Sequence, residues 1–166
     1  YDFFKDWAGP DMTRIKWPND LYWQDRKAGG ILIESISGSA GPDKSLLFAV
    51  GIGININQTI FDPKVRNPVS LKQITGKTYD IVELGKTLCK HLEKWYHAPV
   101  EDVHAAYNAV LFRRGGRVRL RKDLIVFDTT IVGVSPSGHL VTQDPLEREF
   151  LNGEVEWLLD PPSPIQ

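Results

Sequence analysis

The hydrophobic pattern changes its period at Gly115-Gly116, and this change limits the folds open to the chain. Over residues 81–112, just before these glycines, apolar residues recur every three to four positions, which is typical of helices that bury one face. After them, apolar and polar residues alternate in short runs, which is typical of strands. The change predicts an α+β chain with a boundary near residues 113–116. We expect one domain over residues 1–114, a second over 115–160 and a tail over 161–166.

Two helices are expected before this boundary, after a polar and turn-rich stretch at residues 57–79. Asp80 is suited to cap the first helix, with Glu83 at its third position. One face of this helix is apolar: Ile81, Leu84, Leu88, Leu92 and Trp95. A second helix is expected over residues 100–112, with Val103, Ala106, Tyr107 and Val110 facing inward.

Strands are expected on both sides of the helices. In the first part, residues 13–17 predict a short strand and 29–36 a buried β-branched strand. A third strand over 46–56 completes an antiparallel hairpin across the Gly- and Ser-rich loop 37–42. After the boundary, five short strands predict a small β-barrel, at residues 117–121, 125–134, 139–143, 148–151 and 154–159.

The opening residues predict a helix with an aromatic face. Phe3, Phe4 and Trp7 are at helical spacing, and the stop signal Gly9-Pro10 follows them. Such a face requires a surface to cover it. We expect the last turns of a helix that begins before Tyr1. A short N-terminal helix packed on its own domain is the alternative.

Composition excludes several classes of protein. Twenty Lys and Arg against twenty-one Asp and Glu give a net charge of -1, which argues against nucleic-acid and polybasic membrane binding. No apolar run approaches the roughly 20 residues of a membrane helix. The single cysteine, Cys89, excludes an intrachain disulfide and fits a reducing compartment, so a cytoplasmic protein is expected. Cys89 is expected to pack against its helix face, and the four histidines show no metal-ligand spacing.

Three clusters could carry chemistry, at residues 16–27, 29–34 and 51–55. Taken alone, Lys27 before two glycines could bind an anion or be a solvated hairpin lysine. Asp20 could be a turn residue or contact a metal or hydroxyl group. Gly51 and Gly53 could form a β-bulge or contact a nucleotide, and they match neither the Rossmann fingerprint nor a P-loop.

Taken together, these clusters resemble the biotin protein ligases, also called biotin–[acetyl-CoA carboxylase] ligases. The resemblance is carried by Lys-Trp-Pro-Asn-Asp-Leu-Tyr (16–22), Asp-Arg-Lys (25–27), Gly-Ile-Leu-Ile-Glu (30–34) and Gly-Ile-Gly-Ile-Asn (51–55). Their order and spacing match from Ile15 through Asn57. Residues 150–155 look like the closing strand of that family's SH3-like C-terminal domain.

The resemblance implies a fold and a reaction. The fold would be a mixed sheet flanked by helices, akin to class II aminoacyl-tRNA synthetases, followed by an SH3-like barrel. The reaction would join biotin to ATP as biotinyl-5′-AMP, with Mg²⁺, and then transfer biotin to a lysine of a carboxylase carrier domain. Two anions must meet in the first step, so cations and N–H donors are required.

The resemblance also implies roles for individual residues. Lys27 would reach the biotin carboxylate and the α-phosphate, and Asp20 would lie close to the reacting amine and the adenylate. The biotin and adenylate contacts would come from Trp17, Gly29, Gly30, Ile31, Gly51, Gly53 and Asn55. Among these, Asn55 with Gly53 would contact the adenine, and Gly29 to Ile31 would lie along biotin. No metal ligand is implied.

One family element does not occur in this sequence. The Gly/Arg-rich loop that closes over biotin in the family is not found, and residues 113–119 are better explained as a basic strand edge. We therefore expect half of an active site, so the resemblance does not imply activity for this chain by itself. A second copy that covers the exposed sheet edge would make a homodimer.

Two other functions stay open. A lipoate or octanoate ligase uses a related fold, although the Lys-Trp-Pro-Asn-Asp string and the C-terminal barrel favour biotin. A non-catalytic docking fragment would instead use the barrel and the N-terminal aromatic residues to contact a carrier protein. Biotin competition would separate the first alternative, and binding of a carrier protein would test the second.

Overall fold

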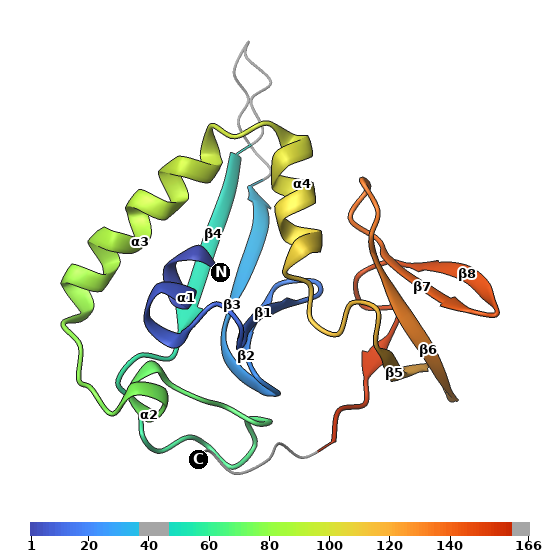
Figure 1. Cartoon of the computed structure of the whole chain (residues 1–166), viewed down its shortest axis with the longest axis horizontal. Helices are drawn as coiled ribbons and strands as arrows, with labels where there is room; N and C mark the ends of the chain where they lie inside the picture. Colours follow the sequence, from blue (N-terminus) through green and yellow to red (C-terminus); the bar gives the residue numbers. More distant parts are fainter. Residues whose placement is uncertain (37–46, 161–166) are drawn as a thin grey trace.

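Two antiparallel sheets and four helices make up the computed structural model, which describes residues 1–36 and 47–160 (Figure 1). The loop predicted at 37–42 and the tail 161–166 lie outside the described residues. The helices are α1 (Asp2–Ala8), α2 (Leu71–Thr75), α3 (Ile81–Tyr96) and α4 (Val100–Ala109). The first four strands are β1 (Thr13–Lys16), β2 (Asp20–Trp23), β3 (Arg26–Ile36) and β4 (Leu47–Ile54). The last five are β5 (Arg117–Lys122), β6 (Ile125–Val134), β7 (Leu140–Asp144), β8 (Leu146–Phe150) and β9 (Glu156–Trp157).

The first sheet has the order β1-β2-β3-β4, and each neighbouring pair is antiparallel. The predicted β3–β4 hairpin is therefore confirmed. A mixed sheet was expected, but the described strands of this sheet are all antiparallel. Parallel pairing is confined to isolated bridges, such as those that join Ile15 to Leu111 and Lys27 to Pro68.

The outer half of the β3–β4 hairpin is exposed, and the prediction of a buried strand over residues 29–36 is wrong for most of its length. Ala28 and Gly29 are buried, whereas residues 31–36 and 47–50 are all exposed. The helices α3 and α4 stand to either side of the hairpin in Figure 1. Their described side chains leave the two hairpin faces open, although the composition of the run is that of a buried strand.

The helices begin largely where the sequence predicts. The Asp80 carboxylate accepts hydrogen bonds from the main-chain N–H groups of Val82 and Glu83, which confirms it as the N-cap of α3. The face of α3 is only partly buried, since Leu84 is buried and Ile81 is exposed. A short helix, α2, was not predicted in the polar stretch 57–79. Its capping box, formed by Ser70 and Gln73, is the signal that could have revealed it.

Helix α4 ends at Ala109, three residues before its predicted end. The following residues leave the helix to pair with β1. The N–H of Ile15 donates to the Val110 carbonyl at 3.0 Å, and the N–H of Phe112 donates to the Ile15 carbonyl at 2.8 Å. This pairing joins the helical segment to the edge of the first sheet, so tertiary hydrogen bonds end the helix.

The second sheet has the order β8-β7-β6-β5-β9, with antiparallel neighbours throughout. Val118 and Leu120 point into the core, and Arg117, Arg119 and Arg121, which alternate with them, point outward, as the pattern predicts. The described strands form an open sheet with β8 and β9 at its edges, whereas a closed barrel was expected.

Two hydrophobic cores stabilise the molecule. One lies under α1 and joins Phe3 and Phe4 to Trp23, Val69 and Leu71. The other joins residues of β1–β2 to the second sheet, across the predicted boundary near 113–116; its members include Trp17, Tyr22, Phe112, Leu120 and Trp157. The second sheet is therefore packed directly on the strands that carry the sequence clusters.

Two smaller predictions have mixed outcomes. Phe3 and Phe4 of the N-terminal helix are buried as expected, while Trp7 is partly exposed and packs edge-on against Tyr79. Cys89 was expected to pack against the helix face, but it is exposed. Among the described residues, no helix is both long and apolar enough to cross a membrane.

Candidate functional site

Lys27 and Asp20 form an ion pair at the inner end of the first sheet. The Lys27 Nζ lies 2.6 Å from the Asp20 Oδ1, with both side chains partly accessible. A register shift between Leu21 and Tyr22 places Lys27 opposite Tyr22 and Gly30 opposite Asp20. This bulge lets one side chain from β2 and another from β3 meet on one face.

The main chain of Lys27 is held by the loop before α2. The Lys27 N–H donates to the Asn67 carbonyl at 2.7 Å, and the Val69 N–H donates to the Lys27 carbonyl at 2.9 Å. This clamp could not be predicted, because residues 57–79 show only a polar, turn-rich composition. The clamp fixes the backbone of Lys27 while its ammonium group stays accessible.

Three glycines leave the sheet surface beside the ion pair without side chains. Gly30 pairs with Gly53, and Leu32 pairs with Gly51, so Gly30, Gly51 and Gly53 lie on one face of the hairpin. A Cβ on Gly53 would have no neighbour within 4 Å, and one on Gly51 would meet only the Leu32 carbonyl oxygen, at 3.9 Å. Neither glycine has a positive φ. Since glycine weakens a strand, their value lies in the open surface that they leave.

Gly29 has a different role on the opposite face. A Cβ at this position would lie 2.4 Å from the carbonyl oxygen of Gly53. Gly29 is therefore required by the packing of β3 against β4. Gly30 has an intermediate amount of free space. A Cβ at this position would lie 3.1 Å from the Asp20 Oδ1, at the ion pair itself.

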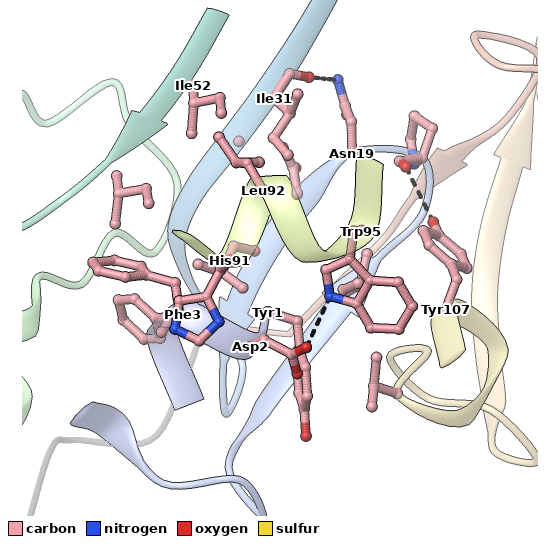
Figure 2. A pocket seen from close by; sticks show the side chains of 18 of the residues that line it. Tyr1, Asp2, Phe3, Asn19, Ile31, Ile52, His91, Leu92, Trp95 and Tyr107 are labelled. Carbon is pink, nitrogen blue, oxygen red and sulfur yellow. Dashed lines mark hydrogen bonds between the residues drawn. The ribbon is translucent and has the colours of Figure 1, made fainter. Parts of the chain in front are cut away.

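The turn that leads into Asp20 is anchored at two points, both drawn in Figure 2. The Asn19 amide nitrogen donates to the Ile31 carbonyl at 2.5 Å, and the Ile31 N–H donates back to the Asn19 carbonyl at 2.9 Å. The Tyr107 hydroxyl of α4 donates to the Pro18 carbonyl at 3.0 Å. Burial raises the pKa of Tyr107, so this hydroxyl keeps its proton. Sequence reasoning gave Asn19 and Tyr107 no role at the site.

Asn55 and Trp17 are largely engaged within the protein. The Asn55 amide nitrogen donates to the carbonyls of Lys27 and Val69, at 3.3 Å and 3.2 Å. Trp17 is buried in the core shared with the second sheet, and its indole N–H donates to the Gly138 carbonyl at 2.9 Å. The structure thus brings Lys27, Asp20 and the glycines together, while Trp17 lies in the core next to them.

Two adjoining cavities open at this place. The smaller, of about 490 Å³, is bordered by Lys27, Asp20 and the three glycines. The larger, of about 770 Å³, runs from the same turn between β3–β4 and the helices α1, α3 and α4. Figure 2 shows its lining, with Ile31 and Ile52 of the hairpin facing Leu92 and Trp95 of α3. The two cavities share the 19–20 turn, but Ile31, Ile33 and Ile52 of the larger one belong to the hairpin face opposite the three glycines.

The cavity beside the ion pair is suited to an anionic group. An ammonium group beside bare main chain attracts phosphate or carboxylate oxygens, and cavities of this size hold small organic molecules. In residues 1–36 and 47–160, no group of three His, Cys, Asp or Glu side chains is placed to hold a metal ion.

Comparisons with known proteins point to one family. Residues 10–57 match the model of the biotin/lipoate A/B protein ligase family. The bifunctional ligase/repressor BirA of Escherichia coli is 29% identical over 154 residues, which cover 89% of this chain and 47% of that protein. The biotin–[acetyl-CoA-carboxylase] ligase of Paracoccus denitrificans is 31% identical over 148 residues, which cover 82% of this chain and 59% of that protein. The chain thus spans about half the length of these curated relatives.

A solved structure shares the fold over almost the whole chain. The biotin protein ligase from Aquifex aeolicus in complex with biotin and ATP superposes with a TM-score of 0.71 and 25% identity. The superposition covers 96% of this chain and 67% of that protein. The α+β fold found here is therefore shared with the superposed part of that structure.

Proposed function

We propose that this chain, which is similar to biotin protein ligases, takes part in the ATP-dependent attachment of biotin to a carrier protein. The observation that carries the proposal is the Lys27–Asp20 pair beside the open glycine face. The pair lies within the segment that matches the ligase family. The cavity on the glycine face supplies room for a small anionic ligand next to the pair.

In the first step, a biotin carboxylate oxygen attacks the α-phosphorus of ATP. An O–P bond forms, the bond from that phosphorus to the bridging oxygen breaks, and pyrophosphate leaves. The step brings two anions together, so its barrier falls when a fixed cation stands between them. Lys27 is the cation that we assign to this place. The glycine face admits the reacting groups next to it.

In the second step, the neutral amine of a carrier lysine attacks the acyl carbon of biotinyl-5′-AMP. A C–N bond forms, the C–O bond to the phosphate breaks, AMP leaves and the amine gives up its proton. We assign to Asp20 the orientation of the incoming amine, because its carboxylate lies directly beside Lys27. The carrier would be the biotin carboxyl carrier domain of a carboxylase.

The remaining predicted residues are assigned to biotin, to the adenylate or to the support of the site. Gly29, Gly30 and Ile31 would form the strand along biotin, and Gly51, Gly53 and Asn55 would face the adenylate. The Asn55 amide nitrogen is shared between two main-chain carbonyls, so its Oδ1 is the atom that we assign to the adenine. Trp17 would act by holding the 18–20 turn against the second sheet, through its bond to Gly138.

Mg²⁺ would enter with the nucleotide, as part of the substrate. Asp20 is the carboxylate next to the site, and Lys27 engages it at 2.6 Å. Among the described residues, the side chains do not form a metal cluster. The donor set therefore does not fit a resident metal ion, and no step above uses one.

We also propose the finer fold assignment. The first sheet with its helices would be part of a catalytic domain like that of class II aminoacyl-tRNA synthetases, over residues 1–114. The second sheet would be SH3-like, over 115–160. The described strands of this second sheet form an open sheet. The hydrophobic core that it shares with Trp17 and Tyr22 supports treating the two parts as one working unit.

Biotin-dependent exchange of pyrophosphate into ATP tests the function. We expect exchange with biotin that Lys27→Ala abolishes and that the exposed-lysine control Lys90→Ala retains. Equal exchange with lipoate would favour the lipoate branch of the matched family, and exchange that survives Lys27→Ala would contradict the assigned mechanism. Exchange by this chain would show that the expectation of half a site is wrong. A folded chain without exchange would limit its role to binding.

A further inference from the structure

Lys16 is a second lysine on the face that carries the ion pair. It lies directly opposite Asp20 in the β1–β2 register, so the two side chains share one face of the sheet. Its Nζ stands 5.5 Å from the ring centre of Tyr22 and 5.2 Å from that of Trp157. One ring belongs to the first sheet and the other to β9 of the second. The ammonium group is thus held between the two parts of the chain.

Trp157 is fixed in this position by burial. It belongs to the core shared by the two sheets and contacts Phe112. Among the described residues, its indole N–H is buried without a hydrogen-bond acceptor. The ring, and not a hydrogen bond, is therefore what Trp157 offers to Lys16. A cation over an aromatic face is attracted by the ring quadrupole, and it keeps its N–H donors free for another partner.

The charges around Lys16 leave an excess of positive charge at the site. Lys27 and Lys16 flank a single carboxylate, Asp20, and Asp20 is already paired with Lys27. Tyr22 remains neutral, since burial and the nearby carboxylates of Asp20 and Asp25 raise its pKa to about 12. Asp25 is paired with Arg113, so Lys16 and Lys27 share Asp20, which favours a ligand that carries more than one negative charge.

We propose that Lys16 is a second cationic residue of the nucleotide site, oriented by Tyr22 and Trp157 to bind the phosphates next to Lys27. The inference rests on the proposed function and adds to it a residue for the phosphate groups. It also gives the second sheet a part in nucleotide affinity, through the ring of Trp157.

The pH dependence of binding follows from the burial of Lys16. Desolvation lowers its pKa, against the attraction of Asp20 and together with the repulsion of Lys27. Lys16 therefore loses its charge at lower pH than an ordinary lysine, and phosphate affinity falls as the pH rises through that value. An arginine at this position keeps its charge over the same range.

Calorimetric titrations of ATP and of inorganic pyrophosphate into the chain test the proposal. Lys16→Met keeps the length of the side chain and removes the charge, and we expect it to weaken both ligands by about tenfold. Lys16→Arg should bind both within about threefold of the unchanged chain, and its affinity should fall less as the pH rises toward the ordinary lysine value of 10.5. Biotin affinity should be equal in all three, which shows that the fold is intact.

Two variants of Trp157 separate the ring from its N–H group. Trp157→Phe keeps a ring over Lys16 and should bind pyrophosphate like the unchanged chain, whereas Trp157→Leu should weaken it. A loss of affinity in Trp157→Phe would overturn the role of the ring. Unchanged nucleotide affinity in Lys16→Met would overturn the proposal while leaving the role of Lys27 standing. A chain that binds neither biotin nor ATP would overturn the proposed function as well.

Discussion

In the five-stranded sheet, Val118 and Leu120 turn inward and are buried, while Arg119 and Arg121 turn outward and pair with Asp128 and Glu156. In the β3–β4 hairpin, apolar residues occupy both faces and are exposed, and glycines interrupt one of them. Both regions consist of antiparallel strands. They differ in their side-chain contacts: the side chains of β5 are buried or form ion pairs within the described chain, whereas most of those on the β3–β4 hairpin are exposed.

This difference separates two kinds of sequence signal. The strict alternation of apolar and charged residues in β5 predicts which of its residues are buried in the core and contribute to stability. The apolar run with glycines in β3 and β4 is not explained by burial within the described residues, because residues 31–36 are exposed. Its inner end coincides with Lys27, Asp20 and the open glycine face. The proposed ligand contacts therefore lie on the exposed hairpin, whereas the buried alternating residues of β5 contribute to stability.

The largest expected effect is on the free energy of unfolding, and it is seen by comparing one leucine from each sheet. Leu120 on β5 is 0% exposed, and Leu32 on β3 is 59% exposed. Leu120→Ala should lower the free energy of unfolding by about 3 kcal/mol, because it leaves a cavity in the shared core. Leu32→Ala should change it by less than about 0.5 kcal/mol. Urea denaturation measures both. Equal losses would contradict the contrast between the sheets.

The next effect contrasts two glycines of the hairpin. Gly29→Ala places a Cβ 2.4 Å from the Gly53 carbonyl oxygen, so it should cost about 1–3 kcal/mol of stability. Gly53→Ala meets no atom within 4 Å and should leave stability unchanged or slightly raised. Adenylate affinity should respond differently from stability, because Gly53→Ala should weaken adenylate binding even though it does not destabilise the fold. A Gly53→Ala chain that is both destabilised and fully able to bind would refute the assigned roles.

The smallest effect concerns an exposed ion pair of the second sheet. The hydrogen bond from Arg119 holds the pKa of Asp128 below its ordinary value of 3.8. A carboxylate with a lowered pKa stabilises the folded state above the pKa of the unfolded chain, and this contribution is lost as the pH falls through the folded value. Asp128→Asn should therefore show a slightly smaller loss of Tm between about pH 5 and about pH 2. An unchanged acid dependence would show that the pair contributes nothing.

Much of the fold could be predicted from local patterns. The Asp80 cap, the β3–β4 hairpin and the alternating strand β5 are each specified by neighbouring residues. The end of α4 could not be predicted, because Val110 and Phe112 are taken out of the helix by bonds to Ile15, some 95 positions away in the chain. The helix α2 was within reach, since its Ser70–Gln73 capping box is a short sequence signal.

The site divides in the same way. The string of motifs predicted Lys27, Asp20 and the glycines as a group, and the structure brings them onto adjoining strands. The anchors of the site were not visible in the sequence. The clamp on Lys27 comes from residues 67–69, and the hydroxyl that holds Pro18 comes from Tyr107 on α4. Lys16 is the first residue of the 16–22 motif. Its contact with Trp157 could not be predicted, because the two residues are brought together only by the fold.

The central claim is that the Lys27–Asp20 pair and the glycine face bind the adenylate, and titration with biotinyl-5′-AMP tests it most directly. We predict binding by the unchanged chain, loss of about tenfold or more in affinity in Lys27→Ala, and a similar loss in Gly53→Val, whose side chain would occupy the open face. Lys90→Ala, on the exposed side of α3, should bind as the unchanged chain does. Equal affinity for biotinyl-5′-AMP in all four proteins would contradict the account.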